Sequence, residues 1–144
     1  MGLINEWHTK LSMPKHDLAW HKQDIVDELK ELEEARGFIC RWSELSDVVY
    51  TYTRAKWSWH EGVTFPFGRL VFYWGSLYMF PKYSLRWKFF NKLGKRFNRN
   101  LNITEVRNPK KIEKLKDIAL KYNLDTVRFT EEANKLIKGW YFLK

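Results

Sequence analysis

Apolar residues recur at helical spacing in two consecutive segments of the N-terminal third of the chain. The stripe over residues 17–36 consists of Leu18, Ile25, Leu29 and Leu32, and the stripe over residues 43–59 consists of Leu45, Val48, Val49 and Tyr52. Spacings of three, four and seven residues place side chains on one face of an α-helix. The pattern predicts a helix over each segment, with Asp17 as the N-cap and Gly37 as the stop signal of the first.

Later apolar segments predict further helices. "LVFYWGSLYMF" (residues 70–80), bounded by Pro66 and Pro81, reads as a short helix or a strand, and a helix follows over residues 85–98. A last helical region begins near Pro109 and resumes at residues 130–137. We therefore predict an all-α protein, a small helical bundle.

The chain has 144 residues, the size of one domain. We expect a single domain over residues 1–144, made of an acidic helix pair (17–60), an aromatic connection (61–84) and basic C-terminal helices (85–144). Six aromatic residues are expected mostly in the core, with one or two free to stack on a base: Trp42, Trp57, Trp59, Tyr73, Trp74 and Trp87.

Cysteine usage and hydropathy indicate a soluble cytoplasmic protein. The single cysteine, Cys40, excludes an internal disulfide, fits a reducing compartment and is expected to be buried. The N-terminal residues contain no unbroken apolar stretch typical of a secretory signal, and the longest apolar run, residues 70–80, is too short to cross a bilayer. No membrane association is expected.

Charge is distributed unevenly along a chain with a net charge of +9. Residues 17–47 contain nine acids and four Lys or Arg residues, which gives −5, whereas residues 82–116 contain two acids and twelve Lys or Arg residues, which gives +10. A basic excess indicates an anionic partner without identifying it.

The acids of the first segment fall at spacings that suit a cation site. Glu28 and Glu31 are three residues apart, as are Glu44 and Asp47, so each pair shares a helix face. The short connection "GFICRW" makes the two helices antiparallel neighbours, so the pairs can meet. Four converging carboxylates repel one another unless a cation compensates, and oxygen ligands suit Mg²⁺ or Mn²⁺. Acid pairs at this spacing are also common on solvated helix faces.

Other chemistries have little support in the sequence. No glycine-rich phosphate loop is present, and the four histidines, His8, His16, His21 and His60, lack the HExxH spacing of a zinc site. We expect these histidines to lie on the surface or to be satisfied within the core.

"DELKELEEA" followed by "ELSDVVY" resembles the signature of the MazG-like, all-α nucleoside triphosphate pyrophosphohydrolases. Asp27-Glu28, Glu31 and, after twelve residues, Glu44-x-x-Asp47 match the acids of that pattern. "KLGKRF" is similar to a basic stretch of the same family, which implies that Lys92, Lys95 and Arg96 contact the triphosphate. The aromatic segment from Trp57 to Phe90 is longer than the family pattern leads one to expect.

The resemblance implies a Mg²⁺-dependent hydrolase that converts a nucleoside triphosphate to the monophosphate and pyrophosphate. Glu28, Glu31, Glu44 and Asp47 would hold the ion, which would lower the pKa of an attacking water. Such folds commonly complete their bundles between subunits, so we expect a homo-oligomer, most simply a two-fold dimer, aided by residues 70–80 and the C-terminal "GWYFLK". The alternatives are a basic helical nucleic-acid-binding protein and an inactive interaction module of the same fold.

Overall fold

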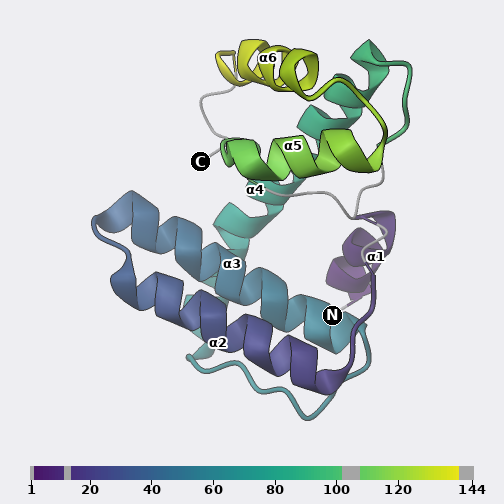
Figure 1. Ribbon diagram of the computed structural model, residues 1–144. Coiled ribbons are helices and arrows are strands. Elements are labelled where there is room, and N and C mark those ends of the chain that lie inside the picture. The colour runs from purple at the N-terminus through teal and green to yellow at the C-terminus, as the bar shows by residue number, and fades with distance from the viewer. Residues whose placement is uncertain (1, 12–13, 102–107, 140–144) are drawn as a thin grey trace. The chain divides into compact units, whose positions relative to one another are not determined.

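The computed structural model describes residues 2–11, 14–101 and 108–139, and every regular element in this part of the chain is a helix (Figure 1). The helices are α1 (Gly2–Leu11), α2 (Leu18–Glu34), α3 (Phe38–Trp57), α4 (Arg69–Arg96), α5 (Ile112–Lys121) and α6 (Thr126–Ile137). The all-α prediction is confirmed. No helix in the described part of the chain combines the length and the apolar character needed to cross a bilayer.

The chain divides into two compact units, residues 1–81 and 82–144. The boundary falls inside α4, and the second unit begins three residues before the predicted start of the basic C-terminal segment at residue 85. The first unit contains α1, α2, α3 and the N-terminal half of α4, and the second contains the rest of α4 with α5 and α6. Whereas the sequence predicts one domain, the structure shows two units, each with its own buried residues.

An antiparallel hairpin of α2 and α3 forms the centre of the first unit (Figure 1). Asp17 is the N-cap of α2, as predicted, and its carboxylate accepts a hydrogen bond from the backbone N–H of Trp20 at 2.8 Å. The connection is shorter than expected, because α3 begins at Phe38 instead of Ser43. Gly37 directly precedes α3 with a φ of +83°, a backbone conformation that favours glycine.

The N-terminal half of α4 packs closely on α3. A Cβ atom at Gly75 would lie 2.6 Å from Cγ2 of Val49, so any larger residue here would force the two helices or Val49 to shift. The Trp42 indole N–H donates to the backbone carbonyl of Trp74 at 2.8 Å, and the two rings stack with centroids 4.5 Å apart. These contacts fix the position of the aromatic segment against the hairpin.

Helix α1 was not predicted from the sequence. It packs on α3 and buries Leu11 and His8. Nε2 of His8 lies 2.9 Å from the Thr53 hydroxyl, which itself donates to the carbonyl of Tyr50. Because the hydroxyl can give its one proton to Tyr50, it can accept a hydrogen bond from the Nε2–H tautomer of His8.

The second unit encloses an apolar core between α4, α5 and α6. Its buried members are Phe89, Phe90, Leu93, Leu101, Leu115, Ile118, Ala119, Phe129, Ala133 and Leu136. Asp125 caps α6 by accepting a hydrogen bond from the backbone N–H of Arg128 at 2.8 Å. The last helical region thus resumes at Thr126, four residues earlier than predicted. Residues 102–107, ahead of α5 in sequence, and residues 140–144 of the C-terminal "GWYFLK" lie outside the described residues.

Several expectations about the aromatic segment were wrong. Residues 70–80 are neither a strand nor a separate helix, because α4 continues through Pro81. Trp59, Tyr73 and Trp74 are exposed to 81%, 63% and 44%, and the other three aromatics expected in the core, Trp42, Trp57 and Trp87, are half-buried.

Two expectations about the hairpin were also wrong. Cys40 is exposed, since it lies in the first turn of the longer α3. Leu18, at the start of the α2 stripe, is exposed as well.

Candidate functional site

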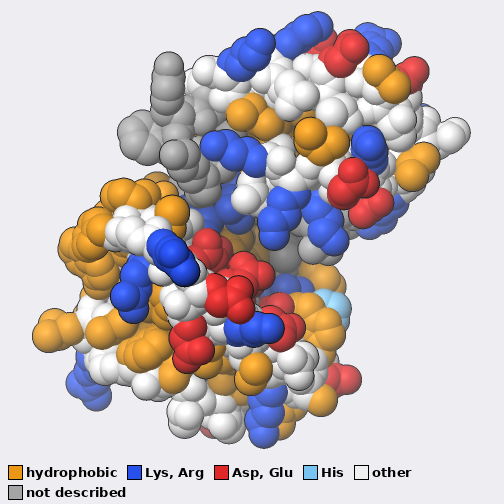
Figure 2. All heavy atoms as spheres, turned by 60° about the vertical axis from the view of Figure 1, so that its left-hand side comes forward, with side chains coloured by type: hydrophobic (Ala, Val, Ile, Leu, Met, Phe, Trp, Pro, Cys, Tyr) orange, Lys and Arg blue, Asp and Glu red, His pale blue; other side chains and the backbone are white. Residues whose placement is uncertain are grey.

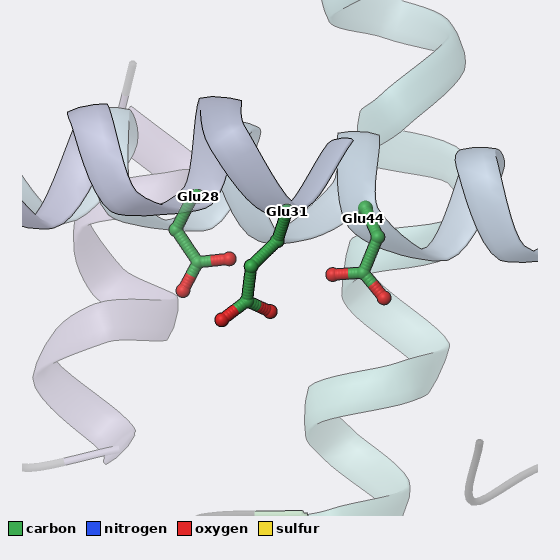
Figure 3. Close-up of side chains that lie close together, drawn as sticks. All are labelled: Glu28, Glu31 and Glu44. Atoms are coloured by element: carbon green, nitrogen blue, oxygen red, sulfur yellow. The ribbon is translucent and has the colours of Figure 1, made fainter. Parts of the chain in front are cut away.

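Three carboxylates converge on one side of the α2–α3 hairpin. Glu28 and Glu31 project from α2 and Glu44 from α3, and each contributes an oxygen within 4.8 Å of the other two (Figure 3). Glu28 and Glu44 are half-buried, whereas Glu31 is exposed. Acidic side chains gather on this face of the first unit (Figure 2). We call these three residues the acidic cluster.

Local sequence accounts for this convergence. The three-residue spacing of Glu28 and Glu31 places them on one face of α2. Leu29 and Tyr52 pack against the small core of Ile25, Ala55 and Val63, which holds α2 beside α3. Since α3 returns antiparallel after a three-residue connection, Glu44 in its second turn lies opposite the C-terminal half of α2.

The electrostatics of the cluster centre on Glu28. The pKa of Glu28 is raised to about 8. Burial is the largest cause, and the negative charges of Asp47 and Glu31 follow. Asp24 and Glu44 raise the pKa further. Without a cation, the Glu28 carboxyl is therefore mostly protonated at neutral pH, which relieves the repulsion within the cluster.

Asp47, the fourth predicted ligand, lies outside the group of converging oxygens. Its charge is nevertheless the largest electrostatic contribution to the raised pKa of Glu28. The structure therefore brings together three of the four predicted acids and keeps the negative charge of the fourth within electrostatic reach. Asp47 and Glu44 both also interact with other groups of the protein.

The predicted phosphate-binding residues belong to the second unit. Lys92 and Lys95 are exposed on α4, and no described carboxylate pairs with either of them. The Arg96 guanidinium forms an ion pair with Glu132 of α6, and Lys135 shares the same carboxylate at 2.8 Å. Contact between these three basic residues and a triphosphate stays a prediction.

The first unit also contains a largely apolar pocket of about 500 Å³ formed by α2, α3, α4 and the segment before α4. It is lined by Leu29, Leu32, Glu33, Phe38, Arg41, Trp42, Leu45, Phe67, Val71 and Trp74. The sequence did not identify which aromatic residues were available to a ligand. Of the six candidate aromatics, Trp42 and Trp74 line this pocket, and Tyr73 lines a smaller one of about 230 Å³.

Two histidines are fully buried in the first unit, and none of the four belongs to the acidic cluster. His8 has the Thr53 partner described above. His21 lies 5.3 Å from His60 between ring centroids, and neither of its ring nitrogens has a hydrogen-bond partner in the described structure. The prediction that core histidines have hydrogen-bond partners is correct for Nε2 of His8 and wrong for His21.

We expect the protein to lose stability as the pH falls below about 6.5. Burial, and secondarily the charge of Arg54, lowers the pKa of His8 to about 3 and that of His21 to about 4. As the pH falls, the unfolded chain protonates its histidines near pH 6.5, before the folded protein protonates His8 and His21. The free energy of unfolding is therefore highest above about pH 6.5 and declines toward pH 4. His21→Leu should flatten the acid side of a urea-unfolding profile measured against pH. An identical profile would contradict this assignment.

No protein-family model, curated protein or solved structure matches this chain.

Proposed function

We propose that the chain is a Mg²⁺-dependent hydrolase that cleaves a nucleoside triphosphate to the monophosphate and pyrophosphate. The observation that carries the proposal is the convergence of Glu28, Glu31 and Glu44, with the Glu28 carboxyl held far from its ordinary pKa. The choice of reaction rests on the resemblance of the acidic pattern, from Asp27 to Asp47, to the MazG-like signature.

The donor set fits a hard divalent cation. All three converging groups are carboxylates, which suit Mg²⁺ or Mn²⁺ better than a metal that prefers nitrogen or sulfur. When bound, Mg²⁺ supplies positive charge to phosphate oxygens and lowers the pKa of an attacking water. Glu28 must release its proton to join this donor set, so ion binding near neutral pH should release a proton.

The remaining residues would bind and orient the substrate. Trp42 and Trp74 provide flat apolar walls in a pocket large enough for a nucleobase. Lys92 and Lys95, which have no carboxylate partner in the described structure, would neutralise charge on the departing pyrophosphate. Arg96 would have to leave Glu132 to do the same, so we expect it to contribute less.

The direct test incubates the full chain with a panel of ribo- and deoxyribonucleoside triphosphates, with Mg²⁺ and with excess chelator, and separates the products. We expect monophosphate and pyrophosphate with Mg²⁺ and no cleavage in chelator. Diphosphate and inorganic phosphate would place the attack at a different phosphorus. Cation binding without cleavage of any triphosphate would contradict the hydrolase and favour an inactive interaction module.

The proposal includes assembly as a two-fold homodimer through an apolar stripe on the N-terminal half of α4. Its members, Leu70, Tyr73, Trp74 and Leu77, follow i, i+3, i+4, i+7 spacing and are exposed to 84%, 63%, 44% and 63%. An exposed apolar face of this kind is typical of a subunit interface. The stripe contains no charged side chain, so two copies can meet there without like-charge repulsion although the chain carries +9.

Disruption of this stripe should produce a monomer. We expect sedimentation to show a salt-insensitive dimer for the wild type, because apolar burial is not screened by ions. The double variant Leu70→Gln/Leu77→Gln should sediment as a folded monomer. Leu120→Gln, an equally polar change at a residue exposed to 67% in the second unit, is the matched control and should leave the dimer intact. A wild-type monomer would contradict the proposed assembly.

A further inference from the structure

The net charge of the protein resides in its second unit. Residues 82–144 contain 17 Lys or Arg and 6 Asp or Glu residues, which gives +11, whereas residues 1–81 contain 9 and 11, which gives −2. A triphosphate carries only a few negative charges, and the proposed substrate therefore accounts for a minor part of this excess. A unit of 63 residues with such an excess is suited to a partner with many negative charges.

The exposed face of α4 in this unit is a line of lysines. Lys88, Lys92 and Lys95 follow one another at spacings of four and three residues and extend about 10 Å along the helix. All three are exposed, and none has an ion-pair partner among the described residues. We call them the basic stripe. Like charges at this spacing repel one another, so an external anion would stabilise the helix.

More cations lie close to the ends of α4 and α5 in sequence. Arg99 follows the end of α4, and Lys110, Lys111 and Lys114 precede or open α5. These four side chains are also exposed and lack a carboxylate partner within the described structure. The excess of cations is thus spread over two elements of one unit, which suits a repeating chain of phosphates better than a single small anion.

We propose that the second unit binds the phosphate backbone of double-stranded nucleic acid through the basic stripe. Successive phosphates of a duplex would neutralise the lysines and release condensed counterions. Contacts of this kind position a protein on the duplex without reading its sequence, so the binding is sequence-independent. This activity is separate from the proposed hydrolysis and requires no divalent cation.

An anionic membrane is a poorer fit to the basic stripe. A helix that lies on a membrane needs an exposed apolar face beside its basic face. The face of α4 opposite the stripe contains Phe89, Phe90 and Leu93, and all three are buried in the core of the unit. No large hydrophobic residue is exposed between residues 82 and 101, so this part of α4 offers nothing to insert between lipids.

The surface of the unit also favours a duplex over a single strand. Proteins that bind single strands combine basic grooves with exposed aromatic rings on which bases stack. The large hydrophobic residues exposed in the described part of this unit are Ile112, Leu120 and Val127, and none is aromatic. The described surface can therefore neutralise phosphates but offers no stacking platform for unpaired bases.

Fluorescence anisotropy with the full chain in excess chelator tests this proposal, because hydrolysis is then suppressed. The probes are a duplex DNA, a duplex RNA and a single strand, all of random sequence and equal length. We expect duplex binding that weakens steeply with salt. Lys88→Gln/Lys92→Gln/Lys95→Gln should lower the affinity at least tenfold and reduce the slope of log affinity against log salt by about 2–3.

A matched variant controls for the total charge. Lys10→Gln/Lys22→Gln/Arg36→Gln removes the same three charges from exposed positions of the first unit and should retain most of the affinity. An equal loss of duplex affinity in both triple variants would show that net charge alone determines binding, and would overturn the proposal. Equal binding of polyglutamate or of anionic vesicles, or tighter binding of the single strand, would also overturn it. The ratio of the two duplex affinities identifies DNA or RNA as the preferred duplex.

Lys88 separates this proposal from the hydrolase, because only Lys92 and Lys95 are shared by the two. The single variant Lys88→Gln should weaken duplex binding severalfold and reduce the salt slope by about 1. Suppose that Lys92→Gln and Lys95→Gln impair triphosphate hydrolysis, but that neither they nor Lys88→Gln change duplex binding. The stripe then binds only the small substrate, and the proposal fails.

Discussion

Glu31→Gln and Asp47→Asn are each expected to lower triphosphate turnover by at least about 100-fold, which corresponds to roughly 2.7 kcal/mol of lost transition-state stabilisation. Glu31 supplies one of the three converging oxygens, and the charge of Asp47 is the largest electrostatic influence on Glu28 after burial. Both substitutions preserve side-chain size and remove a charge. The measurement is kcat/KM for the preferred triphosphate at saturating Mg²⁺.

Glu34→Gln is the matched control for this pair. Glu34 is an exposed acid at the end of the same helix and takes no part in the acidic cluster. Turnover in this variant should stay within about twofold of the wild type, as is usual for an isolated surface charge. Unchanged turnover in both Glu31→Gln and Asp47→Asn would contradict the role of the acids in hydrolysis.

Glu28→Gln is expected to stabilise the cation-free protein, and the gain should grow as the pH rises. The pKa of Glu28 is raised to about 8 in the folded protein from an ordinary value near 4.5, so folding favours its protonated form. Its favourable contribution is fully present below about pH 4.5 and is lost progressively up to about pH 8. The slope in that window is roughly 1.4 kcal/mol per pH unit, or several kcal/mol in total.

Urea unfolding in chelator from about pH 5 to about pH 9, a range that covers most of this window, compares this variant with the wild type. The difference between the two curves isolates Glu28 from the histidines, which act at the acid end. Mg²⁺ should stabilise the wild type more than Glu28→Gln, because the ion compensates the charge that the variant lacks. A pH-independent difference, or a destabilised variant at pH 8, would contradict the raised pKa.

The sequence predicted the acidic helix pair because local rules determine it. The N-cap at Asp17, the apolar positions Ile25 and Val48 and the three-residue spacing of the acids all describe contacts within one hairpin. The prediction of a meeting between Glu28, Glu31 and Glu44 needed only that the helices be antiparallel neighbours. Asp47 was placed with them by spacing alone, whereas membership of the group depends on side-chain directions that spacing does not determine.

The errors occurred where tertiary contacts overrode local signals. Pro81 predicts a helix boundary because a proline cannot donate the hydrogen bond to the carbonyl of Leu77. Leu77 and Pro81 both lie on an exposed face of α4, where water can donate a hydrogen bond to that carbonyl. The helix therefore continues through the proline. α1 was missed because its buried face includes His8, a residue that does not contribute to an apolar pattern. Ile4, Trp7 and Leu11 at helical spacing were the available signal.

The exposure of Trp59, Tyr73 and Trp74 also could not be read from composition. An aromatic-rich segment has enough apolar surface for a core, but α4 approaches α3 closely at Gly75 and buries Met79, whereas Tyr73 and Trp74 stay exposed. The pattern along α4 shows which residues share a face, and it does not show which face meets the hairpin.

Mn²⁺ binding is the sharpest test of the proposed divalent-cation site at Glu28, Glu31 and Glu44. Electron paramagnetic resonance of free Mn²⁺, titrated with the full chain at pH 8, counts bound ions without reference to any substrate. We predict one tightly bound ion per chain in the wild type, retained in Glu34→Gln and lost in Glu31→Gln. No bound Mn²⁺ in the wild type, or equal binding in the wild type and Glu31→Gln, would contradict the account.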